Sequence, residues 1–169
     1  MCSQKDGFAH PEQRRHAHNS LYLPPPELAP LNYAFELHDS RLQEFERRED
    51  GTGFLLFYAV MHRTQGELFR EGQESGYQFA RIYFTSMHVH GPIVLDEYCL
   101  GGSITIEGRT TDHILHLPMD YEGPVRLTLE LSPQFETTIV DAQSIRVELE
   151  GEFKRECVWN DDGTEDGGQ

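Results

Sequence analysis

The feature that most constrains the fold of this chain is a succession of short apolar segments at intervals of roughly 8–12 residues. In the clearest one, Val125, Leu127, Leu129 and Leu131 alternate with polar residues. Because successive side chains of a strand point to opposite faces, this alternation predicts a strand with one buried face. No amphipathic helix of useful length separates the segments. The sequence therefore predicts an all-β domain, either an antiparallel β-sandwich or a small β-barrel, with about eight strands.

Other segments extend this prediction along the chain. Residues 55–61 are uninterruptedly apolar, which predicts a strand covered on both faces or, as the alternative, a short buried helix. Residues 76–91 are rich in aromatic and β-branched side chains and end at a Gly-Pro pair. Toward the C-terminus, residues 135–142 and 143–159 predict two strands joined by a turn at 140–143. Within the second of these, Gly151 is interpreted as a turn or bulge.

Residues 40–50 allow two interpretations. Ser40 followed three positions later by Gln43 resembles the capping box that begins a helix. However, Leu42 and Phe45 alone would give a helix too narrow an apolar stripe. A first strand with a bulge is therefore the preferred prediction, although the sequence leaves the helix open.

The composition changes at both ends of the chain. Residues 1–31 contain five prolines, and we expect them to form a mobile N-terminal leader. Residues 32–159 are predicted to form the β domain, and residues 160–169 an acidic, disordered tail. The N-terminus lacks the apolar segment of a signal peptide, and no apolar run approaches the roughly 20 residues of a membrane span, so we expect neither. The three cysteines are widely spaced, which indicates reduced thiols and a cytoplasmic protein.

The charge of the chain narrows the classes of partner. Fourteen Lys and Arg residues stand against 29 Asp and Glu residues, giving a net charge of -15. Nucleic-acid binding requires a cationic surface, and an anionic membrane repels an acidic protein, so neither is an expected partner. A basic protein is the partner that such a charge suits, because a negative field accelerates encounters with a cationic molecule.

Nine histidines raise the question of a metal site. His88 and His90 are two residues apart, so on a strand both imidazoles would project from the same face. This pair is similar to the start of the first metal motif of cupin barrels. However, Ile82 stands where that motif has glycine, and Glu97 lies further from the second histidine than the glutamate of that motif. The preferred interpretation is a half-exposed strand end, and metal binding stays open.

His38, Asp39 and Ser40 have the residue types of a hydrolase triad. A nucleophilic triad needs its three groups to converge, whereas adjacent residues on a strand point in alternating directions. The triplet is therefore interpreted as a structural element, with Asp39 and Ser40 accepting backbone N–H groups. A ligand-binding role for His38 and Asp39, completed by His62 or by the His88 and His90 pair, is the alternative.

Several segments together resemble a group of small uncharacterised bacterial proteins. They are YAFELHDSRLQEFE, GFLLFYAVMHRTQGE, GYQFARIYF and GPVRLTLEL followed by SIRVELEGEF. Members of this group open with Leu-His-Asp-Ser or Leu-His-Asp-Ala and continue as successive strands. The same opening and succession of strands are distantly similar to those of some immunity proteins of polymorphic toxin systems. The resemblance covers about residues 33–157 and implies a bacterial cytoplasmic domain, with no catalytic residues assigned.

Two functions follow as expectations. The first is a non-enzymatic protein-binding domain of the immunity type, whose acidic face caps a basic partner. The alternative is a metal-dependent β-barrel enzyme or small-ligand binder that uses His38, His62, His88 and His90. No cofactor-binding motif is found, so no cofactor is expected.

Overall fold

The computed structural model describes residues 31–65 and 74–156, and every regular element in them is a β-strand. The all-β prediction is confirmed. The predicted leader and acidic tail lie outside the described residues. In the part of the chain that is described, no helix has the length and apolar character needed to cross a membrane.

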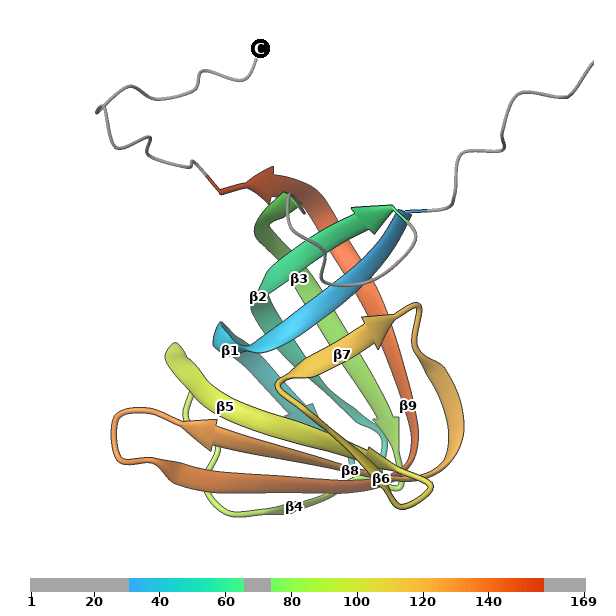
Figure 1. The fold of residues 1–169 in the computed structure, drawn as a ribbon. Coiled ribbons are helices and arrows are strands. Elements are labelled where there is room, and N and C mark those ends of the chain that lie inside the picture. Colours follow the sequence, from blue (N-terminus) through green and yellow to red (C-terminus); the bar gives the residue numbers. More distant parts are fainter. Residues whose placement is uncertain (1–30, 66–73, 157–169) are drawn as a thin grey trace, which may run out of the picture.

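Nine strands follow one another along the chain (Figure 1). Their bounds are β1 Leu31–Arg47, β2 Gly53–Gln65, β3 Glu74–Thr85, β4 His88–His90, β5 Glu97–Ile106, β6 Arg109–Asp112, β7 Ile114–Leu117, β8 Asp120–Leu131 and β9 Glu136–Arg155.

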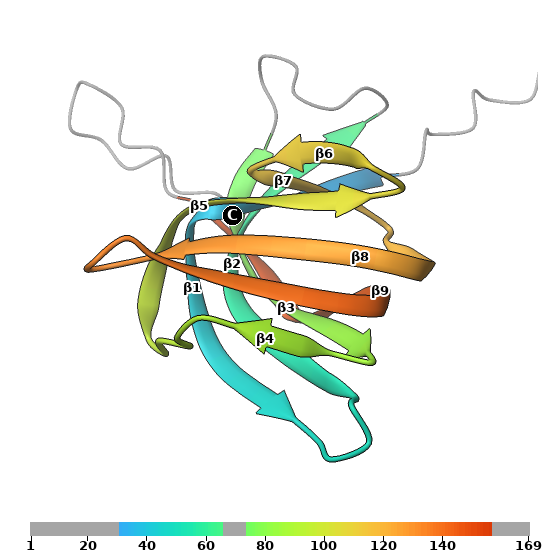
Figure 2. The ribbon, with the colours of Figure 1, turned by 90° about the horizontal axis from the view of Figure 1, so that it is seen from below.

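The strands form one antiparallel sheet that closes on itself. Along the sheet the order is β6-β5-β8-β9-β3-β2-β1-β7, and β5 also pairs with β1. Strands β1, β2, β3, β9, β8 and β5 therefore make a closed cycle, which is a small barrel and not a sandwich. The three short strands extend it, with β6 on β5, β7 on β1 and β4 on β9. Figure 2 shows β6, β5, β8, β9 and β4 side by side in their pairing order.

Strand β1 changes its partner at the His38–Ser40 triplet. Before the triplet, residues 33–36 pair with β7, and after it Arg41 and Leu42 pair with β5. Between these two stretches, the Leu37 N–H donates to the carbonyl of His113, and the His113 N–H donates to the carbonyl of Gly102. The backbone N–H and carbonyl of His113 thus link β1 to β5. We call this contact zone between β1 and β5 the seam.

The triplet itself is a bulge in β1. The register against β2 shifts between Glu36 and Arg41, and Asp39 has a φ of 61°. Ser40 is completely buried, where its hydroxyl donates to the Glu36 carbonyl and accepts the Val60 N–H at 2.8 Å. Residues up to Arg47 are in β1, so the strand with a bulge is confirmed and the helical alternative is wrong.

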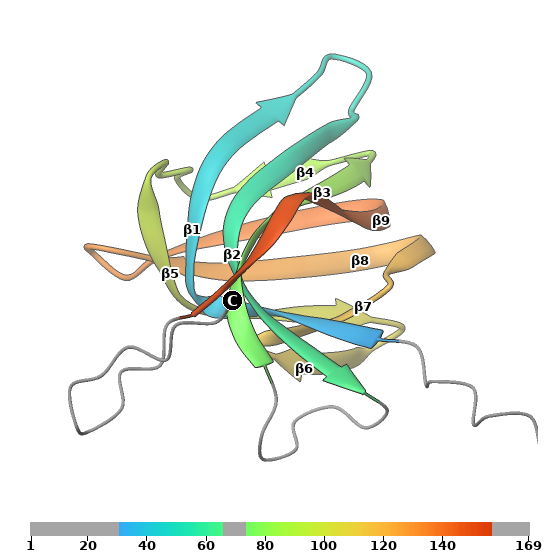
Figure 3. The ribbon, with the colours of Figure 1, turned by 90° about the horizontal axis from the view of Figure 1, so that it is seen from above.

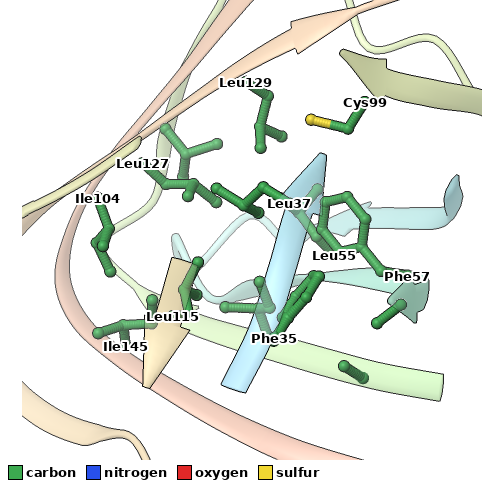
Figure 4. Close-up of a cluster of buried hydrophobic side chains, with 14 of the residues drawn as sticks. Phe35, Leu37, Leu55, Phe57, Cys99, Ile104, Leu115, Leu127, Leu129 and Ile145 are labelled. Carbon is green, nitrogen blue, oxygen red and sulfur yellow. The ribbon is translucent and has the colours of Figure 1, made fainter. Parts of the chain in front are cut away.

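The core fills the inside of the barrel with aliphatic and aromatic side chains from every strand of the cycle. Figure 4 shows side chains from five of these strands and from β7 converging on one another, namely Phe35, Leu37, Leu55, Phe57, Cys99, Ile104, Leu115, Leu127, Leu129 and Ile145. Phe35 and Phe57 meet edge to face with ring centroids 5.3 Å apart. This packing is the main stabilising contribution, because apolar burial drives folding.

Strand β2 explains the apolar run that the sequence shows at 55–61. Leu55, Phe57, Ala59 and Met61 point into the core and are fully buried. The side chains between them point to the other face, where Leu56 is buried and Tyr58 and Val60 are half-buried. The run is therefore a strand, as predicted. One of its faces is completely buried and the other is partly buried.

The predicted turn at 140–143 is wrong. Strand β9 runs without interruption from Glu136 to Arg155, because it pairs first with β8 and then continues along β3. Val140 and Ala142 keep the inward position through the expected turn. The bulge at Gly151 is confirmed, since the register against β3 shifts there and Gly151 has a φ of +70°, a conformation that glycine adopts without strain.

Candidate functional site

Two of the histidines singled out in the sequence come together on the outside of the barrel. His38 and His62 line a shallow pocket of about 570 Å³. We call it the histidine pocket, and its other lining residues are Glu36, Asp112, His113 and Ile114. It lies where β1, β2 and the β6–β7 segment meet, so it forms only because β7 is paired with β1.

Two of the imidazoles in the histidine pocket, those of His38 and His62, lie beside a carboxylate. His62 Nε2 lies 2.7 Å from Glu36 Oε2, and its Nδ1 lies 3.0 Å from the Ser75 hydroxyl. His38 Nδ1 lies 3.1 Å from Asp39 Oδ2, and both of these side chains are exposed, at 46% and 67%. The rings of His38 and His113 are 6.4 Å apart and nearly perpendicular. The pocket therefore combines imidazoles with carboxylates at hydrogen-bonding distance.

The other predicted pair lies elsewhere. His88 and His90 are exposed on β4, which pairs with β9. His90 Nε2 is 3.6 Å from Asp141 Oδ2, and Asp141 also accepts two hydrogen bonds from Arg126. The hydrogen bond from Arg126 is the main reason why the pKa of Asp141 lies below its usual value. His88 lines a separate pocket with Tyr121 and Asp141.

The histidines do not make a metal centre in the described part of the chain. Across residues 31–65 and 74–156, no three His, Cys, Asp or Glu side chains are placed so that they could hold a metal ion. The adjacent His38, Asp39 and Ser40 do not form a triad either. Ser40 is buried and bonded to backbone groups, whereas His38 and Asp39 are exposed, so the serine hydroxyl cannot reach a substrate in solution.

A second feature lies next to the histidine pocket on the outside of the barrel. Cross-strand partners on five consecutive strands align Tyr98 of β5, Arg41 of β1, Tyr58 of β2, Phe79 of β3 and Glu150 of β9. Directly paired residues share one face of a sheet. We call this set the outer row, and its five strands can be followed in Figure 3. The neighbouring residues Leu42, Phe57, Ala80 and Cys99 point into the core.

Ring contacts hold the outer row in place. The Arg41 guanidinium lies 4.7 Å from the centroid of the Tyr98 ring, within the range of a cation–π contact. Tyr58 packs on Phe79 with centroids 5.2 Å apart and stacks on Tyr77 at 5.3 Å with nearly parallel planes. Such offset and tilted aromatic pairs stabilise one another beyond their burial.

The outer row and the histidine pocket are continuous. In the next cross-strand set along β1 and β2, Glu36 pairs with Val60, and Val60 pairs with Tyr77. The pKa of Tyr77 is raised mainly by burial and further by the nearby carboxylates of Glu156 and Asp39. The face thus combines aromatic rings with surrounding negative charge.

Sequence reasoning missed the outer row because aromatic residues in apolar strands ordinarily belong to the core. One signal was present. In an extended segment, Ala80, Ile82 and Phe84 share one face, so the alternate positions Phe79 and Tyr83 lie on the other. The sequence does not show which residues align across neighbouring strands, because that alignment depends on strand registers that no single segment determines.

Comparison with known proteins adds no family to this description. No family model, no curated protein and no solved structure matches the chain.

Proposed function

We propose that this chain is a non-enzymatic protein-binding domain whose partner is a basic protein. The observation that carries the proposal is the distribution of charge. The chain has 29 acidic and 14 basic residues, and six of the described arginines are held in ion pairs with Asp or Glu, namely Arg48, Arg63, Arg81, Arg126, Arg146 and Arg155. The surplus of acids therefore faces solvent with little positive charge free to offset it.

A surface of this kind favours association with a cationic protein. Its field raises the association rate, and like-charged macromolecules are repelled. In the immunity-type form of this function, the partner is a basic toxin such as a nuclease, and the acidic face blocks the channel through which the toxin takes its substrate. The distant similarity of the opening segment and the strand succession to some immunity proteins of polymorphic toxin systems supports this form.

Co-expression of the full chain with the products of neighbouring genes tests the proposal. We expect a complex with a basic protein whose dissociation constant rises at least tenfold between about 50 and 300 mM NaCl, because screening weakens charge steering and rim contacts. Absence of any complex, or a complex that salt leaves unchanged, would contradict the proposal. A toxin partner should in addition lose its activity when bound.

A second candidate function is a small-ligand binder at the histidine pocket. The gathering of His38, His62 and His113 with Glu36 and Asp112 supports it. Thermal-shift measurements with a panel of small amines test it. A ligand bound there should raise the unfolding temperature of the full chain, and a His38→Ala variant should abolish that rise while His88→Ala retains it.

A further inference from the structure

The outer row contains half of the large hydrophobic side chains that the described residues expose. Four large hydrophobic side chains are exposed among the described residues, and two of them, Phe79 at 38% and Tyr98 at 47%, belong to the row. Arg41 and Tyr58 connect these two rings across the sheet. Tyrosine and arginine are enriched at the energetic centres of protein interfaces. The composition of the row is therefore that of an interface centre.

The row is also ordered before any partner arrives. Arg41 lies over Tyr98, and Tyr58 is held between Phe79 and Tyr77 by ring contacts. All of these residues stand on paired strands of the closed barrel. Side chains that are already fixed lose little conformational entropy on binding, which increases the affinity for a given contact area.

Carboxylates surround the aromatic rings. Glu150 ends the row beside Phe79, and Glu44 lies with it around the Arg81 guanidinium. The Asp39 carboxylate is 67% exposed and lies near Tyr77, the ring that stacks on Tyr58. A planar cation that stacks on the rings would thus find carboxylate acceptors for its N–H groups beside the row.

On the same face, guanidinium groups of this chain already lie over aromatic rings. Arg81 lies 4.2 Å from the centroid of Phe54, and Arg146 lies 5.1 Å from that of Tyr83. Arginine suits this arrangement better than lysine, because its flat guanidinium stacks on a ring and presents several donors in one plane. The exposed rings next to carboxylates offer the same kind of contact to an arginine guanidinium of another protein.

We infer that the outer row is the docking surface for the basic partner and that it selects arginine side chains, which stack on Phe79 and Tyr98 and donate to the flanking carboxylates. This inference rests on the proposed function, since it names the surface and the chemistry by which the basic partner is bound. The flanking carboxylates attract the partner, and the rings distinguish arginine from lysine.

Two synthetic peptides of about twelve residues test the inference, each with four cationic residues separated by glycine and serine. One carries arginine and the other lysine, so their charges match. Titrated into the full chain at low salt and followed by NMR, the arginine peptide should shift the ring signals of Phe79 and Tyr98. We expect it to bind roughly threefold or more tightly than the lysine peptide.

Variants locate the binding surface. The double variant Phe79→Ser/Tyr98→Ser should weaken binding of the arginine peptide about tenfold. Phe135→Ser removes another exposed ring, which is 73% exposed and lies outside the row, and should change binding less than about twofold. Amide spectra of both variants confirm that the barrel is retained.

The outcomes separate the two proposals. If both peptides bind equally well, or if the double variant binds as the unchanged chain does, the inference about the row is wrong while the binding of a basic partner stands. If neither peptide binds even at low salt, the inference fails and the proposed function loses its electrostatic basis as well.

Discussion

Ser40 is a polar side chain that the barrel buries completely. Its hydroxyl accepts the Val60 N–H and donates to the Glu36 carbonyl, so it satisfies two backbone groups where the bulge interrupts the ladder. We expect Ser40→Ala to lower the free energy of unfolding by about 1–3 kcal/mol, because it leaves a buried N–H without an acceptor. Urea denaturation measures this change.

Ser103→Ala is the matched control for Ser40→Ala. Ser103 is half-buried in β5, and its hydroxyl carries no structural role comparable to that of Ser40. Its removal should alter the free energy of unfolding by less than about 0.5 kcal/mol. Equal effects of the two substitutions would show that the Ser40 hydroxyl does not support the bulge.

Cys99 is a thiol enclosed by the core. Burial raises its pKa to about 11, because the apolar surroundings disfavour the thiolate. Below that pKa the thiol stays protonated, so at about pH 8 it should react with Ellman's reagent far more slowly than a free cysteine. A Cys2→Ser/Cys157→Ser variant isolates Cys99 for the measurement. Rapid labelling without denaturant would contradict the prediction, whereas labelling should become fast once urea unfolds the chain.

At the scale of the elements, the seam is the narrowest contact in the barrel. Strands β1 and β5 pair directly only through Arg41 and Leu42 with Tyr98 and Glu97, whereas β2 and β3 pair along eleven consecutive positions. Local opening begins where few bonds have to break. We therefore expect the seam to open before the rest of the barrel unfolds.

Hydrogen exchange measures this opening amide by amide. The N–H groups of Leu37 and His113 close the seam, and they should exchange faster than those of Leu55 and Phe57 in β2, with the difference disappearing as urea approaches the unfolding midpoint. Equal protection of the two sets in water would show that the barrel opens as a single unit.

The elements differ in how far the sequence alone predicts them. Strand β8 is predictable because the alternation of apolar and polar residues along it directly indicates one buried face. Strand β9 is predictable only in part, since its continuity through 140–143 depends on two partners, β8 and β3, that no local pattern reveals. Strand number and class follow from local periodicity, while closure into a barrel depends on the pairing of β5 with β1.

The candidate site is harder to predict than the fold for the same reason. His38 and His62 could be named from their residue type, but His113 joins them only through the pairing of β7 with β1. In the outer row, Arg41 looks like an ordinary charged residue of a strand. Its place between Tyr98 and Tyr58 comes from two long-range registers, and registers are set by the whole sheet.

For the whole molecule, the charge of -15 predicts a response to salt. Repulsion among the surplus acids opposes folding, and exposed ion pairs stabilise only weakly. Raising NaCl from about 20 to 200 mM should therefore increase the thermal midpoint by about 2–5 °C at neutral pH. Differential scanning calorimetry measures it.

The control for this salt effect is the same series near the isoelectric point of about 4.9. There the net charge is close to zero and the increase should vanish. An increase of the same size at both pH values would attribute the effect to general salting-out and not to charge repulsion.

The closed cycle of strands also determines the order in which the chain can complete its fold. Strand β1 is the first of the described strands in the sequence, yet its partners on one edge, β5 and β7, come far later. Contacts between distant residues carry a large loop-closure cost, so folding should be slow for a domain of this size. During synthesis, one edge of β1 stays without its partner strand until β7 has emerged from the ribosome. The strand that begins the barrel therefore keeps one edge unpaired while four further strands, β2 to β5, are made and until β7 follows them.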